Sequence, residues 1–574
     1  MIKTLKTFYS FVFNYKKDFI FFVFVLLFTT ILGNTTPYIS KLLIDAVPSL
    51  DYSLLLKLTS LFIGVRIVTN LLKSFNVYLG DKVLFPASRD ARVKVFKKVQ
   101  DLDFAFHVNK STGKLISIFK RGDRAFFSLF DAIHHDILEV LISLFVSLFF
   151  LAQITPITSL LMFFTFSINL FISWRLIELN MEKRKIFNQS EDKISGIITD
   201  NLLNYETVKF FAQEEKEENR LKQEFKDWLN KFWQYANSFR LINMVSGTLS
   251  NLGVLGILWI VIRRLQLGLI GIGDLVMAIS LTTSFYYGFF NLMHQVRSIA
   301  KHYTDIESYF SVLGSEILVK DPEKPIELKK IKGKINFENV SFSYKDGKQD
   351  ILKKMDLHIE PGESVAFVGY SGVGKTTIMR LLLRFYDVNE GRILIDGIDI
   401  RQLTKSQLRS FIGIVPQDPI LFNNTIKFNL TYGNPSVTKK AMEKAIKVAN
   451  LQGFVNSLPA GYDTQVGERG IKLSGGQKQR LAIARMILTD PKIIIFDEAT
   501  SSLDSESESL IQESLWEVAE NRTTLIIAHR FSTIAGVDKI VVIEKGNIVE
   551  MGSHEKLIEK KGIYHSLWKL QSQK

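Results

Sequence analysis

Six apolar segments, each of about 20 residues, dominate the first 310 residues of this 574-residue chain. A segment of about 20 apolar residues can cross the hydrocarbon core of a bilayer as a helix. Lipid offers no hydrogen bonds to the backbone, so a spanning segment must be a helix or part of a closed barrel. We therefore expect six helical spans, near Phe19–Ile39, Leu54–Val77, Ile137–Leu151, Ile157–Ile177, Val245–Leu265 and Leu275–Met293.

The apolar segments have one alternative explanation, the buried helical core of a large soluble protein. The first segment disfavours it, because Phe19–Ile39 carries almost no charge over its whole length. Pro156 lies in the short break between the third and fourth segments and predicts a tight turn between two helices. The first segment is too long for a signal-peptide core and lacks a clear small-residue cleavage site, so we expect no cleaved leader.

The charge pattern predicts the partners and the orientation. A net charge of +14 suits either nucleic acid or an anionic membrane face, and the apolar segments favour the lipid bilayer over nucleic acid. Lysines precede the first span, and the segments after spans two and four are rich in Lys and Arg. These segments, the N-terminus and the C-terminal half should be cytoplasmic, although Arg263 and Arg264 break the pattern. The absence of cysteine excludes disulfides and thiolate metal sites.

A phosphate-binding loop lies in the second half of the chain, at Gly369-Tyr-Ser-Gly-Val-Gly374-Lys375-Thr376. Its glycines let backbone N–H groups turn inward toward phosphate oxygens, Lys375 can reach the β- and γ-phosphates, and the Thr376 hydroxyl can hold Mg²⁺. The apolar run Ser364–Val368 predicts a buried strand before the loop, and Thr377–Arg384 predicts a helix after it. This context favours a genuine nucleotide site over a chance match.

Two more segments fit the same site. The run Lys492-Ile-Ile-Ile-Phe-Asp497-Glu498 predicts a buried strand that ends in two carboxylates. Asp497 can bind Mg²⁺ and Glu498 can activate water, although paired acids also end ordinary strands. Leu473-Ser-Gly-Gly-Gln477 precedes a predicted helix and offers a second anion site. The two phosphate-binding edges need not share one pocket, which suggests that two chains enclose each nucleotide.

Together these motifs resemble the ATP-binding cassette (ABC) family, and the apolar half resembles its six-span exporters. The resemblance covers nearly the whole chain. It implies that Tyr344 stacks on adenine, that Gln417 contacts Mg²⁺ and water, and that His529 acts with Glu498 in catalysis. It implies Mg²⁺ ligation by Thr376, Gln417 and Asp497, and ATP contacts from Tyr344, Gly369, Ser371, Gly372, Gly374, Lys375, Thr376, Thr377, Ser474, Gly475, Gly476, Gln477 and Asp504.

The resemblance also implies an architecture and an activity. We expect an all-α transmembrane domain at 1–310, a linker at 311–334 and an α/β P-loop ATPase domain at 335–574. The cofactors would be ATP and Mg²⁺, and the working unit a dimer with a second half-transporter chain, expected to be identical. The chain would hydrolyse ATP to export a small amphipathic or organic substrate by alternating access across a membrane, expected to be the bacterial inner membrane. A membrane scaffold or pore that uses ATP only as a switch is the alternative class.

The substrate is least constrained by the sequence. Asn204–Phe211 and Gly273–Met277 are similar to the mitochondrial iron–sulfur and heavy-metal half-transporters, which export glutathione-linked species. Arg184 and Arg297 match two of the arginines that this subfamily uses, but Asn180 and Ala300 stand where two others are expected. A multidrug or lipid exporter remains the broader alternative. Polar residues inside the spans are candidates for a substrate cavity, namely Arg66, Asn291, His294 and Arg297.

Overall fold

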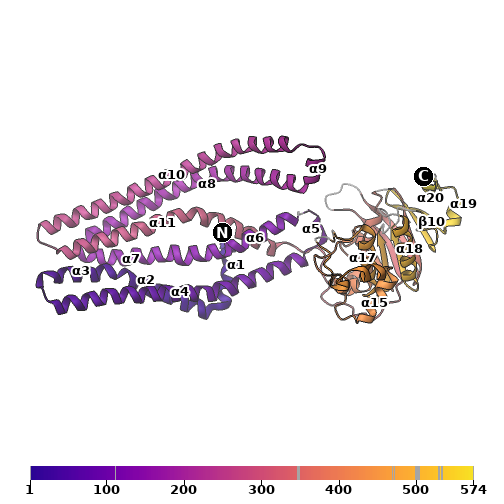
Figure 1. Ribbon diagram of the computed structural model, residues 1–574, viewed down its shortest axis with the longest axis horizontal. Helices are drawn as coiled ribbons and strands as arrows, with labels where there is room; N and C mark the ends of the chain where they lie inside the picture. The colour runs from indigo at the N-terminus through magenta and orange to yellow at the C-terminus, as the bar shows by residue number, and fades with distance from the viewer. Residues whose placement is uncertain are drawn as a thin grey trace. The chain divides into compact units, whose positions relative to one another are not determined.

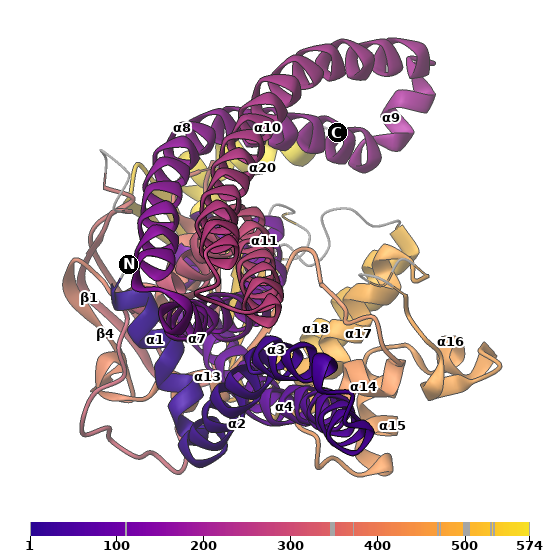
Figure 2. The ribbon, with the colours of Figure 1, turned by 90° about the vertical axis from the view of Figure 1, so that its left-hand side faces the viewer.

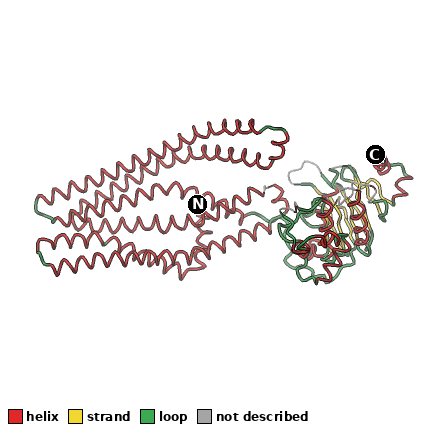
Figure 3. Tube along the Cα trace, viewed as in Figure 1, coloured by secondary structure: helices red, strands yellow, loops and turns green. Residues whose placement is uncertain are grey.

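The computed structural model describes residues 2–109, 112–344, 350–370, 372–467, 470, 472–497, 505–527, 531 and 534–572. Two compact units make up the chain. The first contains 1–101 and 110–315, and the second contains 102–109 and 316–574. Among the described residues the first unit consists of helices, whereas the second combines helices with strands (Figure 3).

Within its described residues, the first unit contains six helical regions long and apolar enough to cross a membrane, as the sequence predicts. They belong to a bundle of long helices and short linking ones (Figure 1). The helices are α1 (Ile2–Val12), α2 (Lys16–Asn34), α3 (Thr36–Ala46), α4 (Tyr52–Asp101), α6 (Thr112–Asp131), α7 (Leu138–Ile154), α8 (Pro156–Leu203), α9 (Tyr205–Phe210), α10 (Glu214–Gln266) and α11 (Ile272–Ser311).

Two prolines mark breaks between helices of the bundle. Pro156 is the first residue of α8 and follows α7 after one extended residue, Thr155, which confirms the predicted tight turn. The first predicted span is two helices, because Pro37 has no N–H to give the carbonyl four residues earlier. That carbonyl, on Gly33, accepts the Thr36 hydroxyl at 2.8 Å. The chain therefore continues from α2 to α3 with a break at one residue, Thr35.

The helices of the first unit form three groups in space. Figures 1 and 2 both show α2, α3 and α4 on one side, α8 and α10 on the other, and α7 with α11 between them. A six-residue π-helical segment, Ala132–Ile137, joins α6 to α7. One buried apolar cluster joins α7, α8, α10 and α11, with Ile257, Met277 and Phe289 fully enclosed. This packing fixes the walls of the cavity described below.

The second unit holds two sheets. The strands are β1 (Ile335–Phe342), β2 (Leu352–Ile359), β3 (Ser364–Val368), β4 (Glu390–Ile395), β5 (Ile398–Asp399), β6 (Ile412–Val415), β7 (Ile493–Asp497), β8 (Thr523–Ile527), β9 (Lys539–Glu544) and β10 (Asn547–Gly552). An antiparallel sheet has the order β2-β1-β4-β5. The larger sheet has the order β10-β9-β3-β8-β7-β6 and is parallel except for the pair β9–β10.

The described residues of this unit also form helices. They are α5 (Phe104–Asn109), α12 (Lys375–Leu382), α13 (Lys405–Ser410), α14 (Ile426–Thr431), α15 (Lys439–Val448), α16 (Gln452–Ser457), α17 (Gly475–Ile487), α18 (Ser505–Ala519), α19 (His554–Glu559) and α20 (Ile563–Ser572). One apolar cluster encloses α12 between strands of both sheets, and another joins the larger sheet to α15, α17 and α18. Strand β3 and helix α12 confirm the elements predicted around the phosphate loop.

Candidate functional site

The register of the larger sheet brings the predicted ATP-site segments to one edge. Neighbouring strands pair Phe367 with Ile527, Asp497 with Ile527, and Val415 with Phe496. Because these strands are parallel, their carboxyl ends meet at the same edge. The phosphate loop follows β3, Asp497 ends β7, and Gln417 comes two residues after β6. The fold therefore brings together residues that lie more than a hundred positions apart in the chain.

Two glycines allow the phosphate loop to turn. Gly374 has φ of +107°, a left-handed value that favours glycine, directly before α12 begins at Lys375. At Gly369 a Cβ atom would lie 2.4 Å from the carbonyl oxygen of Ile543 on β9. The Lys375 ammonium is buried and donates to the carbonyl oxygens of Gly369 at 2.8 Å and Tyr370 at 3.0 Å. The cation is thus held beneath the loop, where phosphate would bind.

The second predicted anion site is a capped helix start. The Ser474 hydroxyl accepts the N–H of Gln477 at 3.2 Å, and the Gln477 side chain accepts the N–H of Ser474 at 2.9 Å. This reciprocal capping fixes the start of α17 at Gly475 and Gly476. Gly475 is exposed at this positive end of the helix, where an anion would bind, whereas Gly476 is buried.

The edge of the sheet also carries side chains that would suit Mg²⁺. A hydroxyl from Thr376, an amide oxygen from Gln417 and a carboxylate from Asp497 are the hard oxygen donors that Mg²⁺ prefers. The strand register above gathers the segments that carry them, so these residues fit the ion. Four predicted site residues, Ser371, Glu498, Asp504 and His529, lie outside the described residues.

The expected adenine-stacking residue, Tyr344, follows β1 and is half-buried. Its hydroxyl lies 3.2 Å from the Thr377 hydroxyl and accepts a hydrogen bond from Arg380 at 3.2 Å. Thr377 and Arg380 are three residues apart on α12, so they lie on the same face of that helix. Tyr344 is thereby tied to the helix that begins with the phosphate-loop lysine.

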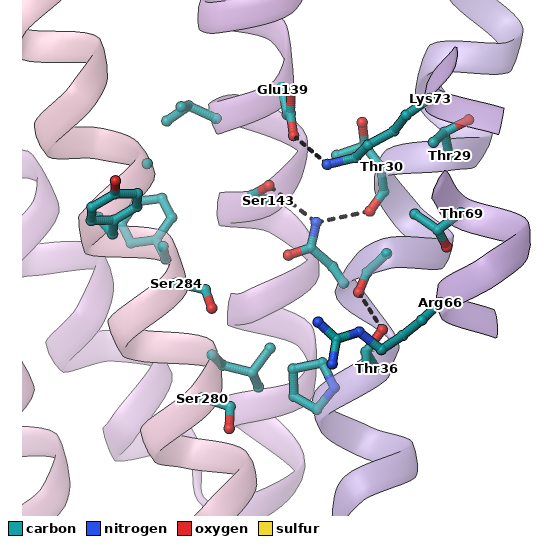
Figure 4. Close-up of a pocket in the computed structure, with 18 of the residues that line it drawn as sticks. Thr29, Thr30, Thr36, Arg66, Thr69, Lys73, Glu139, Ser143, Ser280 and Ser284 are labelled. Carbon is teal, nitrogen blue, oxygen red and sulfur yellow. Dashed lines mark hydrogen bonds and ion pairs between the residues drawn. The ribbon is translucent and has the colours of Figure 1, made fainter. Parts of the chain in front are cut away.

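A cavity of about 940 Å³ lies among the spans of the first unit (Figure 4). Side chains from α2, α3, α4, α7, α11 and the π-helical segment line it, including Arg66 and Asn291 from the predicted substrate set. The side chains of the other two, His294 and Arg297, are outside the described residues. Hydroxyl groups supply much of the polar wall: Thr29, Thr30, Thr36, Ser40, Thr69, Ser143, Ser280 and Ser284.

Both signs of charge face this cavity. Figure 4 shows Arg66 pointing into it from α4, and its guanidinium carbon lies 5.6 Å from the Phe62 ring centre. Among the described residues Arg66 forms no ion pair. Lys73 on α4 and Glu139 on α7 form an ion pair at 3.8 Å, and the Asp136 carboxylate accepts from Gln295 at 3.0 Å. Of the described residues that line the cavity, Arg66 is therefore a cation without a carboxylate partner.

Sequence reasoning missed several cavity residues that its own rule could have found. Lys73 and Glu139 are charged residues within apolar spans, as Arg66 is. The adjacent residues His134 and His135 have different surroundings: His134 is buried, with its ring Nδ1 2.8 Å from the Phe130 carbonyl oxygen, while His135 lines the cavity. Both lie in the π-helical segment, which no sequence pattern predicted.

Family models match both halves of the chain. The model described as ABC transporter transmembrane region matches 19–288, and the model described as ABC transporter matches 352–501. Among solved structures, that of a bacterial Atm1-family ABC exporter with ATP bound is similar, with a TM-score of 0.86 and 32% identity. The match covers 97% of this chain and 98% of the other.

Curated relatives point the same way. Heavy metal tolerance factor 1 of Caenorhabditis elegans is 34% identical over 96% of this chain and 70% of its own length. The ATM1-type heavy metal exporter of Novosphingobium aromaticivorans is 36% identical over 85% of this chain and 80% of its own length. The human ATP-binding cassette sub-family B member 6 is 36% identical over 88% of this chain, which spans only 60% of that protein.

Proposed function

This chain belongs to the ABC transporter family, as an ATP-hydrolysing half-transporter of the exporter type, and we propose that it exports a small organic molecule that carries an anionic group. The observation that carries the substrate proposal is Arg66, a cation that faces a polar cavity among the spans and forms no ion pair with any carboxylate that the structure describes. A guanidinium in a membrane span is costly unless it is solvated or paired. A bound carboxylate, phosphate or sulfonate would supply that partner, with bidentate hydrogen bonds.

The cavity also suits a substrate with a mixed character. Its wall combines hydroxyls and amides with apolar groups such as Phe62, Leu281 and Phe285. An amphipathic molecule could place an anionic group against Arg66 and an apolar part against these side chains. A volume of about 940 Å³ is within the usual range for small-molecule sites.

Export of a glutathione conjugate or of a chelated heavy metal is the second candidate. The names of two relatives, heavy metal tolerance factor 1 and an ATM1-type heavy metal exporter, favour it. The chain has no cysteine, and its described residues hold no group of three His, Asp or Glu that could bind a metal ion. A metal would therefore travel as an anionic complex rather than as a bare ion.

One position at which the glutathione-exporter subfamily has an arginine has a different role in this chain. Asn180, which stands where the subfamily has an arginine, is buried against α10. Its amide donates to the Ser238 hydroxyl at 2.7 Å and to the Tyr235 carbonyl at 3.4 Å. Asn180 thus joins two helices instead of presenting a cation to a ligand. A glutathione-type ligand would depend on Arg66 and the remaining arginines.

We propose that two identical chains form the working unit, with each ATP between the phosphate loop of one chain and the Ser474–Gln477 segment of the other. In this mechanism Lys375 and the α12 N-terminus hold the phosphates, Glu498 polarises the attacking water, and His529 contacts the γ-phosphate. Mg²⁺ would neutralise phosphate charge on Thr376, Gln417 and Asp497. ATP binding favours one membrane state and hydrolysis the other, so substrate access alternates. Both ATPase units would lie in the cytoplasm.

A second contact between the two chains should involve α9. This helix and the residue after it expose three aromatic side chains: Tyr205, Phe210 and Phe211. The ATPase unit has a groove lined by Pro419, Ile420 and Tyr432 that could receive them from the partner. The chain lacks cysteine, so a Phe210→Cys, Ile420→Cys variant tests this directly. Oxidation should give a disulfide-linked dimer, and either single variant should not.

The decisive experiment is the ATPase rate in lipid nanodiscs, comparing the wild type with Glu498→Gln. Organic anions, oxidised glutathione, glutathione–metal complexes, lipids and lipophilic cations are added in turn. Stimulation by organic anions supports the main proposal, and stimulation restricted to glutathione species selects the second candidate. Stimulation only by lipids or lipophilic cations would overturn both. Equal, near-zero rates in the two proteins would favour an ATP-switched scaffold or pore.

A further inference from the structure

We propose that Arg380 and Tyr386 form a joint that couples nucleotide-base binding at Tyr344 to the position of helix α5. Each of the two residues contacts Tyr344 on one side and Phe104, the first residue of α5, on the other. All four residues belong to the second unit. The proposal rests on the ATP-driven function above and adds a route by which the membrane helices would respond to the nucleotide.

Helix α5 connects two helices of the membrane unit but packs with the ATPase residues. It lies between α4, which ends at Asp101, and α6, which begins at Thr112. The clustering of contacts assigns 102–109 to the unit that contains 316–574. The carboxylate of Asp103, directly before this helix, accepts the backbone N–H groups of Leu318 and Val319, the latter at 3.2 Å. A movement of α5 would therefore act directly on α4 and α6.

The Phe104 ring sits in a cradle of aromatic and cationic groups. It stacks on Phe385 with ring centres 4.9 Å apart and planes only 11° from parallel. The Arg380 guanidinium lies 5.3 Å from the Phe104 ring centre, and Tyr386 approaches its edge at 6.2 Å. Arg409 lies 4.8 Å from the Phe385 ring centre and supports the cradle. Aromatic and cation–π contacts have preferred geometries, so a movement of Arg380 or Tyr386 should change the position of Phe104.

Tyr344 holds the opposite side of the same two residues. Arg380 donates to its hydroxyl at 3.2 Å, and the Tyr386 ring meets the Tyr344 ring edge-on at 5.2 Å. The guanidinium can do both tasks because it donates hydrogen bonds from its edge and contacts rings with its face. Burial, and then the neighbouring Tyr344, raise the pKa of Tyr386, so this ring stays neutral at physiological pH.

A base stacked on Tyr344 would fix the plane of that ring. The hydroxyl and the ring edge cannot then move independently of Arg380 and Tyr386, which would set where Phe104 rests. Coupling of this kind is reciprocal, so the position of α5 must also affect nucleotide binding. An aromatic residue that only stacks on the base needs neither the hydroxyl nor Arg380, and this difference makes the joint testable.

The absence of cysteine allows a direct measurement on the full dimer in nanodiscs. A spin label at Leu267→Cys, in the exposed turn after α10, reports the distance between the two chains. The distance distribution is recorded without nucleotide and with saturating MgATP analogue that is not hydrolysed. Nucleotide affinity is measured separately with a fluorescent analogue. Saturation separates loss of coupling from weaker binding.

Three variants test the joint: Tyr344→Phe keeps the stacking ring but removes the hydroxyl, Arg380→Met keeps the chain length, and Phe104→Leu removes the ring of α5. The measured quantity is the ratio of the conformation that saturating nucleotide favours to the conformation seen without nucleotide. Each variant should lower this ratio by about fivefold or more, within the usual range of coupling factors. Arg380→Lys should restore little, because an ammonium lacks the planar face. Arg392→Met is the matched control. Arg392 lies on β4 and forms an ion pair with Glu338 on β1 at 2.7 Å, so this variant should behave like the wild type.

The double variant Arg380→Met, Phe104→Leu gives the strictest test. If both act through one contact, its effect should be close to that of either single variant, whereas independent effects would add. Wild-type population shifts in both Tyr344→Phe and Arg380→Met would overturn the joint while leaving ATP-driven export intact. A wild-type protein that neither turns over ATP nor responds to nucleotide would overturn the proposed function, and the joint with it.

Discussion

The ATP site and the membrane cavity are built in opposite ways. The phosphate loop is a continuous stretch in which backbone N–H groups and two constrained glycines carry the chemistry. The cavity is assembled from single side chains of α2, α3, α4, α7, α11 and the π-helical segment, none of which is in a recognisable motif. A site made by local backbone shape can be identified from a short sequence. A site made by helix packing can only be suspected from charges in apolar segments.

The largest effect should come from the phosphate-loop lysine. In Lys375→Ala the cation beneath the loop is lost, so ATP turnover should fall at least ~100-fold, as when one preorganised charge-stabilising donor is removed. Lys353→Ala, an exposed lysine on β2, is the control. The measurement is phosphate release in nanodiscs. Turnover within a factor of about two of the wild type would mean that the loop does not hold the reacting phosphates.

A smaller effect is expected for glycine substitutions, which separate a steric clash at the phosphate loop from the strain of a left-handed backbone. Gly369→Ala places a Cβ atom 2.4 Å from the Ile543 carbonyl oxygen, so the loop must move and nucleotide affinity should fall by ~10-fold or more, about 1.4 kcal/mol. Gly362→Ala is matched: its φ is +79°, but an added Cβ would meet nothing within 4 Å. Gly362→Ala should lower only the free energy of unfolding, by the ~1–2 kcal/mol that a left-handed conformation costs a residue with a Cβ atom. Fluorescent-nucleotide titration and thermal unfolding distinguish the two.

The smallest effect should be confined to substrate. The loss of a hydrogen bond to a charged group costs about 1.5–3 kcal/mol of binding free energy. Arg66→Gln should therefore raise the half-saturating concentration of a stimulating organic anion by ~10-fold or more. Arg175→Gln is the control, because that guanidinium also lies near a phenylalanine, 5.9 Å from Phe171, but does not line the cavity. Equal responses in the two variants would remove Arg66 from the substrate site.

The difference between the two regions also explains which predictions succeeded. The strand at Ser364–Val368, the six spans and the turn at Pro156 were predictable, because each depends on the residue types within one short continuous segment. The break between α2 and α3 was missed, because an apolar run continues through Pro37. The proximity of Lys73 to Glu139, 66 positions later, had no local signal.

By itself, the sequence determined the two halves of this protein, its family and the residues expected to hold ATP. These follow from local rules: apolar length suits lipid, and glycines permit one loop shape. The tertiary structure alone decided that Arg66 faces a cavity, that Asn180 joins two helices, and that Phe104 meets Tyr344 through Arg380 and Tyr386. Such contacts depend on how distant segments pack, and packing is set by the whole chain at once.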